Sequence, residues 1–251
     1  MPPKLKVRAD QLAFEQGLAE SREKAKRLIM AGRIIYASGP LLSKPVPKPG
    51  QLCTSDCLLA VSPGERFVSR GAYKLQSMLD AANLDVTGLC CLDAGASTGG
   101  FTDLLLQRGA KKIYAIDVGK NQLHEKLRQD PRVISMEGIN LRYAPHDLIP
   151  EKIDFLTGDL SFISLTLVLP SCQTWLAPKA LAALLIKPQF ELSPEEVEKG
   201  VVRKEQSRQK AVNKIKNFCS QKLGWSLLQC VPSAIKGPKG NQEYMALFQT
   251  P

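Results

Sequence analysis

Two lysines and two carboxylates stand where apolar runs of the sequence meet turns. Asp159 lies in "GDLSF", Lys187 ends the apolar run of "LLIKPQFE", Glu243 opens another apolar run, and Lys74 lies in "SRGAYK". A lysine at the end of a core strand costs free energy unless it has a partner. If the four side chains meet, they suit the activation of a poor nucleophile such as a hydroxyl group.

The roles within this set follow from charge. Lys187 would accept the proton of the hydroxyl, and Lys74 would stabilise the alkoxide that develops. The carboxylates favour the charged form of each lysine, so Asp159 and Glu243 would mainly orient the lysines and a cationic reactant. The sequence leaves open which lysine is the base. It also allows a plain alternative, in which the four form ion pairs that only close the edge of a sheet.

A glycine-rich turn predicts a nucleotide site. In "CLDAGASTGGFTD" an apolar strand ends in an acid, three glycines follow, and a helix begins. The dinucleotide fingerprint GxGxxG would need glycine at 97, where the chain has Ser97, and that glycine is the one that lets backbone approach a pyrophosphate. The phosphate-binding pattern GxxxxGK[ST] is absent too. The turn therefore favours a nucleoside without a pyrophosphate.

Two acidic residues indicate which nucleoside would bind at this turn. Asp93 ends the first strand and could hold the amino group of an amino-acid moiety, and Asp117 ends the next strand, where a carboxylate can accept both ribose hydroxyls. S-adenosylmethionine meets these demands, although another nucleotide stays open. The expected cofactor residues are Asp93, Gly95, Ala96, Ser97, Thr98, Gly99, Gly100 and Asp117, with Asn140 near the adenine.

The residues after the fourth strand limit what is methylated. Enzymes that methylate exocyclic base amines carry Asn/Asp-Pro-Pro-aromatic at this edge, but residues 159–162 read Asp-Leu-Ser-Phe. Methylation of carbon 5 of a pyrimidine needs a cysteine nucleophile there, and the nearest, Cys172, falls in the following helical pattern. Both base chemistries are disfavoured, and Tyr73 and Phe162 are candidate surfaces for stacking a base.

The elements that would position these residues form an α/β fold. Seven strands are predicted, and helical patterns separate most of them, which favours a mostly parallel, Rossmann-like sheet covered on both faces. The last two strands lie close together and predict an antiparallel hairpin at one edge. The predicted strands are Leu89–Asp93, Lys112–Val118, Val133–Glu137, Ile153–Gly158, Leu181–Ile186, Leu227–Ser233 and Glu243–Phe248.

Charge marks a second, smaller domain. The net charge is +10, and residues 1–66 hold 11 Lys/Arg against 6 Asp/Glu, so half of the excess lies in the first quarter of the chain. Such an excess favours an anionic partner. We predict a small α+β RNA-binding domain over residues 1–62, a linker at 63–66, and the Rossmann-like domain over 67–251. In the small domain a helix is expected to start at Ser21 and stop at Gly32. The expected phosphate-binding residues of this domain are Arg8, Arg22, Lys26 and Arg33.

Composition bears on metal binding, secretion and membrane association. Seven cysteines without a CxxC pair and only two histidines favour reduced thiols and no metal site. The N-terminal residues have no apolar core for a signal peptide, and prolines and a lysine interrupt the most apolar segment, residues 165–186. We therefore expect a cytoplasmic protein without a membrane partner; its oligomeric state stays open.

Several motifs together resemble one family. "SRGAYKL", "DAGASTGGFTD", "IDVG", "GDLSFISL", "IKPQFE" and "GPKGNQEY" occur in one order, and "ESREKAKRLIMAG" precedes them. The chain resembles the TlyA (hemolysin A) family, in which an RNA-binding domain of the ribosomal-protein-S4 type precedes an FtsJ-like methyltransferase. The resemblance implies ribose 2′-O-methylation of cytidine in ribosomal RNA (16S, 23S or both) with S-adenosylmethionine, and a catalytic tetrad of Lys74, Asp159, Lys187 and Glu243.

Other functions remain as alternatives to this enzyme. A non-catalytic RNA-binding or ribosome-assembly factor could keep the fold without the chemistry, and the haemolysin name raises membrane lysis. The sequence does not say which nucleotide or which subunit is modified, or whether intact ribosomal subunits are required.

Overall fold

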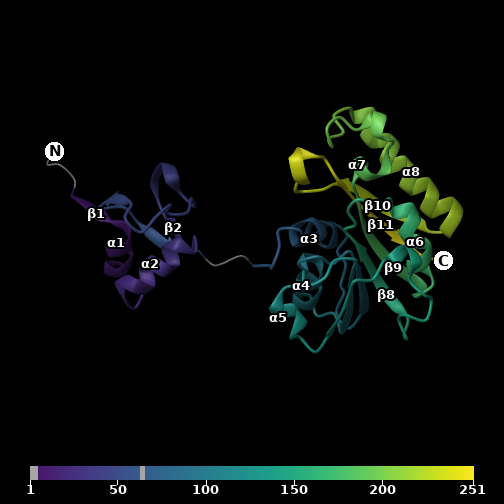
Figure 1. Ribbon diagram of the computed structural model, residues 1–251, viewed down its shortest axis with the longest axis horizontal. Coiled ribbons are helices and arrows are strands. Elements are labelled where there is room, and N and C mark those ends of the chain that lie inside the picture. Colours follow the sequence, from purple (N-terminus) through teal and green to yellow (C-terminus); the bar gives the residue numbers. More distant parts are fainter. Residues whose placement is uncertain (1–4, 63–65) are drawn as a thin grey trace. The chain divides into compact units, whose positions relative to one another are not determined.

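The chain divides into two compact units in a computed structural model that describes residues 5–62 and 66–251. The units are Met1–Arg66 and Phe67–Pro251 (Figure 1). Of the predicted linker at residues 63–66, only Arg66 lies within the described residues.

The N-terminal unit packs two helices against short antiparallel strand pairs. The Oγ of Ser21 accepts a hydrogen bond from the Lys24 amide at 3.2 Å, which confirms the predicted helix start, and Ala25 and Ile29 are buried in the small core. Strand β1 pairs with β3, and β2 pairs with β4. The elements are β1 Lys6–Arg8, α1 Ala9–Glu15, α2 Arg22–Met30, β2 Ile34–Tyr36, β3 Leu52–Thr54 and β4 Leu59–Val61.

The second unit is built on a seven-stranded sheet in the order β10-β11-β9-β8-β5-β6-β7. Strands β5 to β9 are parallel, and β11 runs antiparallel between β9 and β10. The predicted α/β class and the antiparallel hairpin at the edge are confirmed. The strands are β5 Cys90–Ala94, β6 Lys112–Asp117, β7 Val133–Glu137, β8 Ile153–Gly158, β9 Leu176–Ile186, β10 Ser226–Pro232 and β11 Tyr244–Gln249.

Helices cover both faces of this sheet, and each face has its own apolar core. Alternate residues of the central strand β5 serve the two faces: Leu92 packs with α6 and α8, while Cys91 packs with α3 and α4. Such burial on both faces explains why the parallel strands read as continuous apolar runs. The helices are α3 Ala72–Ala81, α4 Gly100–Gln107, α5 Glu125–Arg128, α6 Leu165–Gln173, α7 Pro188–Glu191 and α8 Glu205–Leu223.

One strand is longer than predicted. Strand β9 begins at Leu176 and passes through Pro178, whereas the sequence predicted a start at Leu181. The pairing of β8 with β9 shifts register between Ile153 and Phe155, so the stretch around Pro178 joins the sheet through an irregularity. Proline is tolerated at such a place because it removes only one ladder donor.

The strand order creates a crevice at one edge of the sheet. From β5 the chain proceeds outward through β6 and β7, and it then returns to β8 on the other side of β5. In open α/β sheets, ligands bind outside the carboxyl ends of the strands at this change of direction. Within the described residues, no helix is long and apolar enough to cross a membrane.

Candidate active site

The four candidate catalytic residues form two ion pairs at this edge. Lys187 follows β9, and its Nζ lies 2.5 Å from Oδ1 of Asp159, which follows β8. Lys74, in the first turn of α3, places its Nζ 2.6 Å from Oε2 of Glu243, the residue before β11. Because β11 is antiparallel to β9, its first residue meets the carboxyl ends of the parallel strands.

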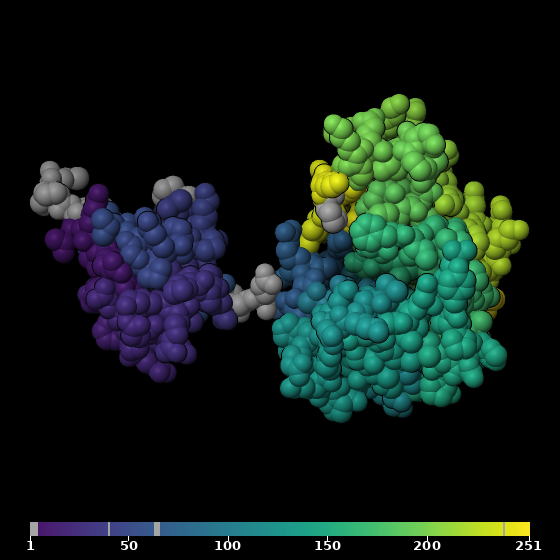
Figure 2. Space-filling model, in the orientation of Figure 1, coloured from purple at the N-terminus to yellow at the C-terminus, as the bar shows by residue number. Residues whose placement is uncertain are grey.

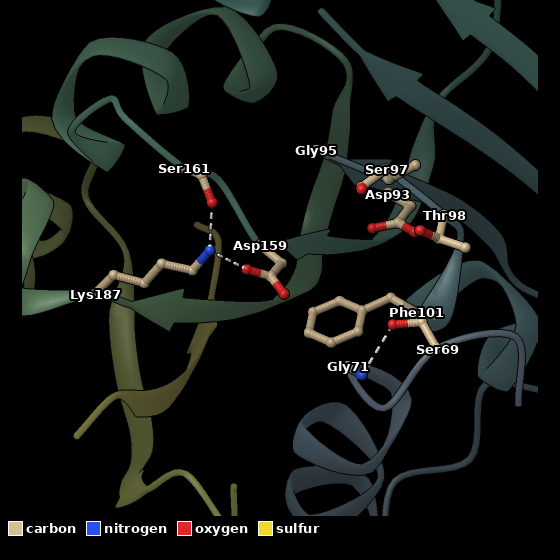
Figure 3. A pocket seen from close by; sticks show the side chains of 12 residues that line it. Ser69, Gly71, Asp93, Gly95, Ser97, Thr98, Phe101, Asp159, Ser161 and Lys187 are labelled. Atoms are coloured by element: carbon tan, nitrogen blue, oxygen red, sulfur yellow. Dashed lines mark hydrogen bonds and ion pairs between the residues drawn. The ribbon is translucent and has the colours of Figure 1, made fainter. Parts of the chain in front are cut away.

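The two pairs differ in what surrounds them. Glu243 is completely buried, and the Nε2 of Gln189 reaches its second oxygen at 3.5 Å. Lys187 also donates to the hydroxyl of Ser161 at 2.8 Å, as Figure 3 shows together with its contact to Asp159. Lys187 is therefore held by two acceptors from the same β8–α6 loop.

A buried carboxylate fixes the back of that loop. Glu191, four residues after Lys187, accepts hydrogen bonds from the Ser164 hydroxyl at 2.5 Å and from the Leu165 amide at 2.8 Å. Lys214 of α8 approaches it at 3.3 Å. Burial raises the pKa of Glu191, although these donors oppose the shift. Glu191 thus ties α7 to the first turn of α6.

The glycine turn after β5 needs glycine at two positions for steric reasons. Gly95 has φ +84°, and a Cβ there would lie 3.0 Å from the Asp159 carbonyl oxygen, so the turn packs directly on the end of β8. Gly99 has φ +95°, and a Cβ there would lie within 2.3 Å of Leu127 in α5. The turn therefore packs between the β8–α6 loop and α5.

Ser97 takes the place of the missing fingerprint glycine. It adopts φ +49°, and its amide donates to Oδ2 of Asp117 at 2.8 Å. The other oxygen of Asp117 accepts from the Gly119 amide at 2.7 Å. Two backbone amides therefore orient the carboxylate expected to bind ribose hydroxyls, and each oxygen keeps capacity for a further hydrogen bond.

Asp93 lies under the turn and is almost completely buried. One oxygen accepts from the amide and the hydroxyl of Thr102 in α4, and the other accepts from the Thr157 hydroxyl of β8 at 3.0 Å. Burial raises its pKa to about 6, and the nearby charge of Asp159 contributes in the same direction. Asp93 thus connects β5 to α4 and β8, and it is also a titratable group beside the site.

Three cavities meet beside these residues. A turn cavity of about 160 Å³ lies between the glycine turn and Lys187, a wide cavity of about 510 Å³ lies beside Asp117, and an apolar cavity of about 400 Å³ reaches Glu243. Ser161 lines all three, and Lys187 lines the turn cavity and the apolar cavity. Two reactants placed in different cavities would therefore meet at Lys187.

The wide cavity fits a nucleoside, and the turn cavity fits its charged end. Asp117 borders the wide cavity, and apolar side chains face it from several elements, which suits a flat base. Asp93 and Asp159 border the turn cavity and would attract cationic groups. Within the part of the chain that the structure describes, no cluster of His, Cys, Asp or Glu could hold a metal ion. The apolar residues of the wide cavity are Ile116, Val118, Ile139, Leu141, Leu160, Phe162, Ile163 and Val168.

Most of the remaining predicted cofactor residues lie at the same cavities. Ala96, Thr98 and Gly100 line the turn cavity, and Asn140 lines the wide cavity, whereas Gly99 lines none of the three. The Oδ1 of Asn140 accepts from the Arg142 amide, which leaves its Nδ2 as the group able to reach a base.

The four predicted RNA-binding cations lie in the N-terminal unit, and each already has a partner. Arg8 and Arg22 both bind the buried carboxylate of Asp10, at 3.0 and 3.1 Å. Lys26 pairs with Glu23 at 2.6 Å, and Arg33 donates to the Ser62 carbonyl. In Arg8 and Arg22 a structural role competes with RNA binding.

Several residues of this site were not expected from the sequence. Ser161, Glu191 and Gly237 have no pattern of their own in the sequence, although each lies within a few residues of Asp159, Lys187 or Glu243. A Cβ on Gly237 would lie 2.0 Å from Oε1 of Glu243. Only the packing of separate loops reveals these contacts.

The cysteine considered for carbon-5 methylation of a pyrimidine is not available as a nucleophile. Cys172 is completely buried in α6, and burial raises its pKa to about 12. Of the two candidate stacking residues, Tyr73 packs edge-on against Phe67 with ring centroids 5.2 Å apart. Phe162 is 91% exposed, has φ +64°, and lines both the wide and the apolar cavity.

Comparison with known proteins identifies relatives along nearly the whole chain. Residues 67–250 match the FtsJ-like methyltransferase family. A Bacillus subtilis protein, provisionally named rRNA methyltransferase YqxC, is 44% identical and covers 98% of this chain and 86% of its own. The 16S/23S rRNA (cytidine-2′-O)-methyltransferase TlyA of Mycobacterium tuberculosis is 40% identical, with 98% and 90% covered.

A solved structure agrees with these matches. A Streptococcus thermophilus protein, provisionally described as a hemolysin, is 41% identical to this chain. It superimposes with a TM-score of 0.73 and covers 99% of this chain and 90% of its own.

Proposed function

This chain belongs to the FtsJ-like methyltransferase family, and we propose that it methylates the ribose 2′-hydroxyl of a cytidine in ribosomal RNA. The methyl donor of this methyltransferase is S-adenosylmethionine. The observation that carries the proposal is the position of Lys187, which lies between the turn cavity and the apolar cavity and is paired with Asp159.

The names of the relatives support this substrate. The relative from Mycobacterium tuberculosis is named for 2′-O-methylation of cytidine in ribosomal RNA, and the match to it covers nearly all of both chains. A ribosomal substrate would be met in the cytoplasm, in agreement with the localisation expected from the sequence.

The cofactor residues act by binding and orientation. When bound, S-adenosylmethionine supplies an electrophilic methyl group on a cationic sulfur. Asp117 would hold the ribose of the cofactor, the apolar residues of the wide cavity would enclose its adenine, and Asn140 would reach the edge of that adenine. Asp93 and Asp159, at the turn cavity, would balance its positive charges.

The catalytic residues act on the acceptor hydroxyl. Lys187 would take the hydroxyl proton at Nζ while the oxygen bonds to the methyl carbon and the bond from that carbon to sulfur breaks, and Asp159 would stabilise the ammonium group. Ser161 keeps Nζ pointed toward the junction of the cavities. Lys74 is not among the described residues that line the three cavities. We therefore assign to Lys74 the role of positioning Glu243.

The apolar cavity would take the acceptor nucleoside. Lys187 and Glu243 border it, and so do the rings of Phe162 and Phe190, whose centroids lie 5.1 Å apart. A ribose inside an RNA helix cannot reach Lys187, so the target nucleotide must leave its stack. The exposed ring of Phe162 would then stack on the displaced base.

The first test is transfer of labelled methyl from S-adenosylmethionine to unmodified ribosomal subunits. Wild type should transfer the label, and Lys187→Ala should be slower by about 10²–10⁴-fold because it lacks the group that takes the proton. A protein that binds ribosomal RNA but transfers no methyl group would support the alternative of a ribosome-assembly factor. Equal rates for the two proteins would contradict the role of Lys187.

A further inference from the structure

Two lysines at the mouth of the apolar cavity adopt a backbone conformation that lysine rarely takes. Lys199 has φ +50° and is followed by Gly200 at φ +83°, and Lys239 has φ +57°. Each lies at the tip of a loop. The left-handed region costs a residue with a Cβ about 1–2 kcal/mol, and glycine or asparagine usually occupies it.

The first loop is a tight hairpin turn. Glu198 and Val201 exchange both backbone hydrogen bonds, at 3.0 and 2.9 Å, so Lys199 and Gly200 are its two central residues. Positive φ at both central residues is the requirement of a type I′ turn, for which Asn-Gly is the favoured pair. Lysine therefore stands where asparagine would be more stable.

The second loop is fastened to the first. The buried side chain of Asn241 donates to the Gly200 carbonyl at 2.8 Å and accepts from the Val202 amide at 3.0 Å. The Nζ of Lys239 donates to the Lys199 carbonyl at 3.3 Å. The two lysines are thus neighbours on joined loops, and Figure 2 shows the yellow C-terminal loop beside the green segment that precedes α8.

Both lysines are exposed next to the catalytic residues. Lys239, Gly200 and Asn241 line the apolar cavity together with Lys187 and Glu243. Within residues 5–62 and 66–251, no carboxylate forms an ion pair with Lys199 or Lys239. Lys236, three residues before Lys239, adds a third exposed cation on the second loop. Exposed positive charge therefore lies on the two joined loops that contribute Gly200 and Lys239 to the lining of the apolar cavity.

We propose that Lys199 and Lys239 bind phosphate groups of the substrate RNA next to the target nucleotide, a proposal that rests on the function proposed above. Two cations above the acceptor cavity match the backbone that flanks a nucleotide drawn into that cavity. Phosphate contacts of this kind fix the register of the RNA without reading its sequence. This function would also account for lysine at two strained positions.

The test exploits this strain. In the double variant Lys199→Asn with Lys239→Asn, the backbone is relaxed and the charges are lost, so the Tm should not fall. Binding of the full-length protein to unmodified ribosomal RNA should weaken, and the slope of log K against log salt should become shallower by about 1 for each lysine. The KM for ribosomal subunits should rise, while the affinity for S-adenosylmethionine should stay the same.

The chain contains a matched control. Lys179 also adopts a positive φ, of +58°, but it lies near the amino end of β9, whereas Lys187 directly follows the carboxyl end of this strand. Lys179→Asn makes the same chemical change and should leave the salt slope unchanged. A second double variant, Lys199→Arg with Lys239→Arg, keeps both charges and should bind RNA as the wild type does.

The outcomes separate this proposal from the proposed function. An unchanged salt slope in the double Asn variant, an equal loss in Lys179→Asn, or an equal loss in the double Arg variant would overturn the phosphate contacts. Binding is measured without methyl transfer, so this result holds whether or not the wild type is active. Failure of the wild type to methylate any ribosomal RNA would overturn the proposed function alone.

Discussion

Burial gives Asp93 a pKa of about 6, well above the ordinary aspartate value of 3.8. The folded protein therefore keeps a proton on Asp93 in a range where the unfolded chain has already lost it. This group opposes folding above pH 6, and its unfavourable contribution disappears as the pH falls toward 4. A cationic ligand in the turn cavity would favour the ionised form and compensate for the burial.

The affinity for S-adenosylmethionine should consequently depend on pH. S-adenosylmethionine should bind the form of the protein in which Asp93 is ionised. Its affinity should therefore fall by about tenfold when the pH falls from 7 to 5, because the Asp93 carboxylate is mostly protonated at pH 5. The residues that line the three cavities include no histidine that would titrate in this range. Calorimetric titration at several pH values measures the effect. An affinity independent of pH would show that Asp93 does not respond to the cofactor.

A second prediction concerns Glu243, whose carboxylate lies against Gly237. Gly237→Ala requires no positive φ, but its Cβ would displace the carboxylate from Lys74. We expect kcat to fall by about tenfold to a hundredfold, because small displacements in a catalytic site have effects of this size. The KM for S-adenosylmethionine should not change. Unaltered kcat would mean that the position of Glu243 does not matter for the reaction.

At the level of single residues, the sequence indicated the candidates but not their partners. Asp159, Lys187 and Glu243 were identifiable because each polar residue borders an apolar run. The pairing of Lys187 with Asp159 depends on β8 and β9 being neighbours in the sheet, and that of Lys74 with Glu243 depends on the position of β11 between β9 and β10, which no local pattern shows. The catalytic and cofactor roles of all these residues stay predictions until they are measured.

Among the elements, the short helix α7 positions Lys187 for the reaction. It begins at Pro188, immediately after Lys187, and Glu191 at its end binds the first turn of α6. The loop with Asp159 and Ser161 is therefore fixed at both ends, by Lys187 at the front and by Glu191 behind. A change at Glu191 should act on Lys187 through the backbone.

Glu191→Ala should lower both stability and kcat. It leaves the buried Leu165 amide and the Ser164 hydroxyl without their acceptor, at a cost of about 1–3 kcal/mol for each group. Chemical denaturation and steady-state kinetics measure the two effects. The control is Glu196→Ala, since Glu196 also pairs with a lysine of α8, Lys210, but on the surface. It should change stability by less than about 1 kcal/mol, and equal effects in both variants would contradict the role of Glu191.

The elements themselves were largely predictable, because apolar runs and glycine-containing turns are local features. All seven predicted strands of the second unit exist, and in six of them each end agrees or differs by one residue. Strand β9 is the exception, because the rule that proline interrupts strands was too strict near an irregular pairing. The three cavities could not be predicted, since they arise where loops from distant parts of the chain meet.

On the scale of the whole molecule, the N-terminal unit adds half of the excess positive charge. Part of that charge is used internally. Burial would raise the pKa of Asp10, but hydrogen bonds from Arg8 and Arg22 outweigh it and hold the pKa below its ordinary range. The exposed Lys24 and Arg27 of α2 have no such buried partner among the described residues.

Substitutions should separate these two kinds of cation. Arg22→Ala should destabilise the N-terminal unit, because the buried Asp10 carboxylate loses one of its two arginine partners, and hydrogen exchange in residues 5–62 should accelerate. The double variant Lys24→Ala with Arg27→Ala should leave exchange unchanged and weaken RNA binding, with a salt slope shallower by about 1 for each residue. Unchanged RNA binding in the double variant would exclude Lys24 and Arg27 from the RNA interface.

The central claim is that the methyl group goes to a ribose hydroxyl of cytidine. The most direct measurement digests labelled ribosomal RNA to nucleosides after methyl transfer by wild type and by Lys187→Ala, and identifies the labelled product by chromatography. We predict that the label is in 2′-O-methylcytidine and disappears with Lys187→Ala. Label on a base, or in 2′-O-methylcytidine at an equal level with both proteins, would contradict this account.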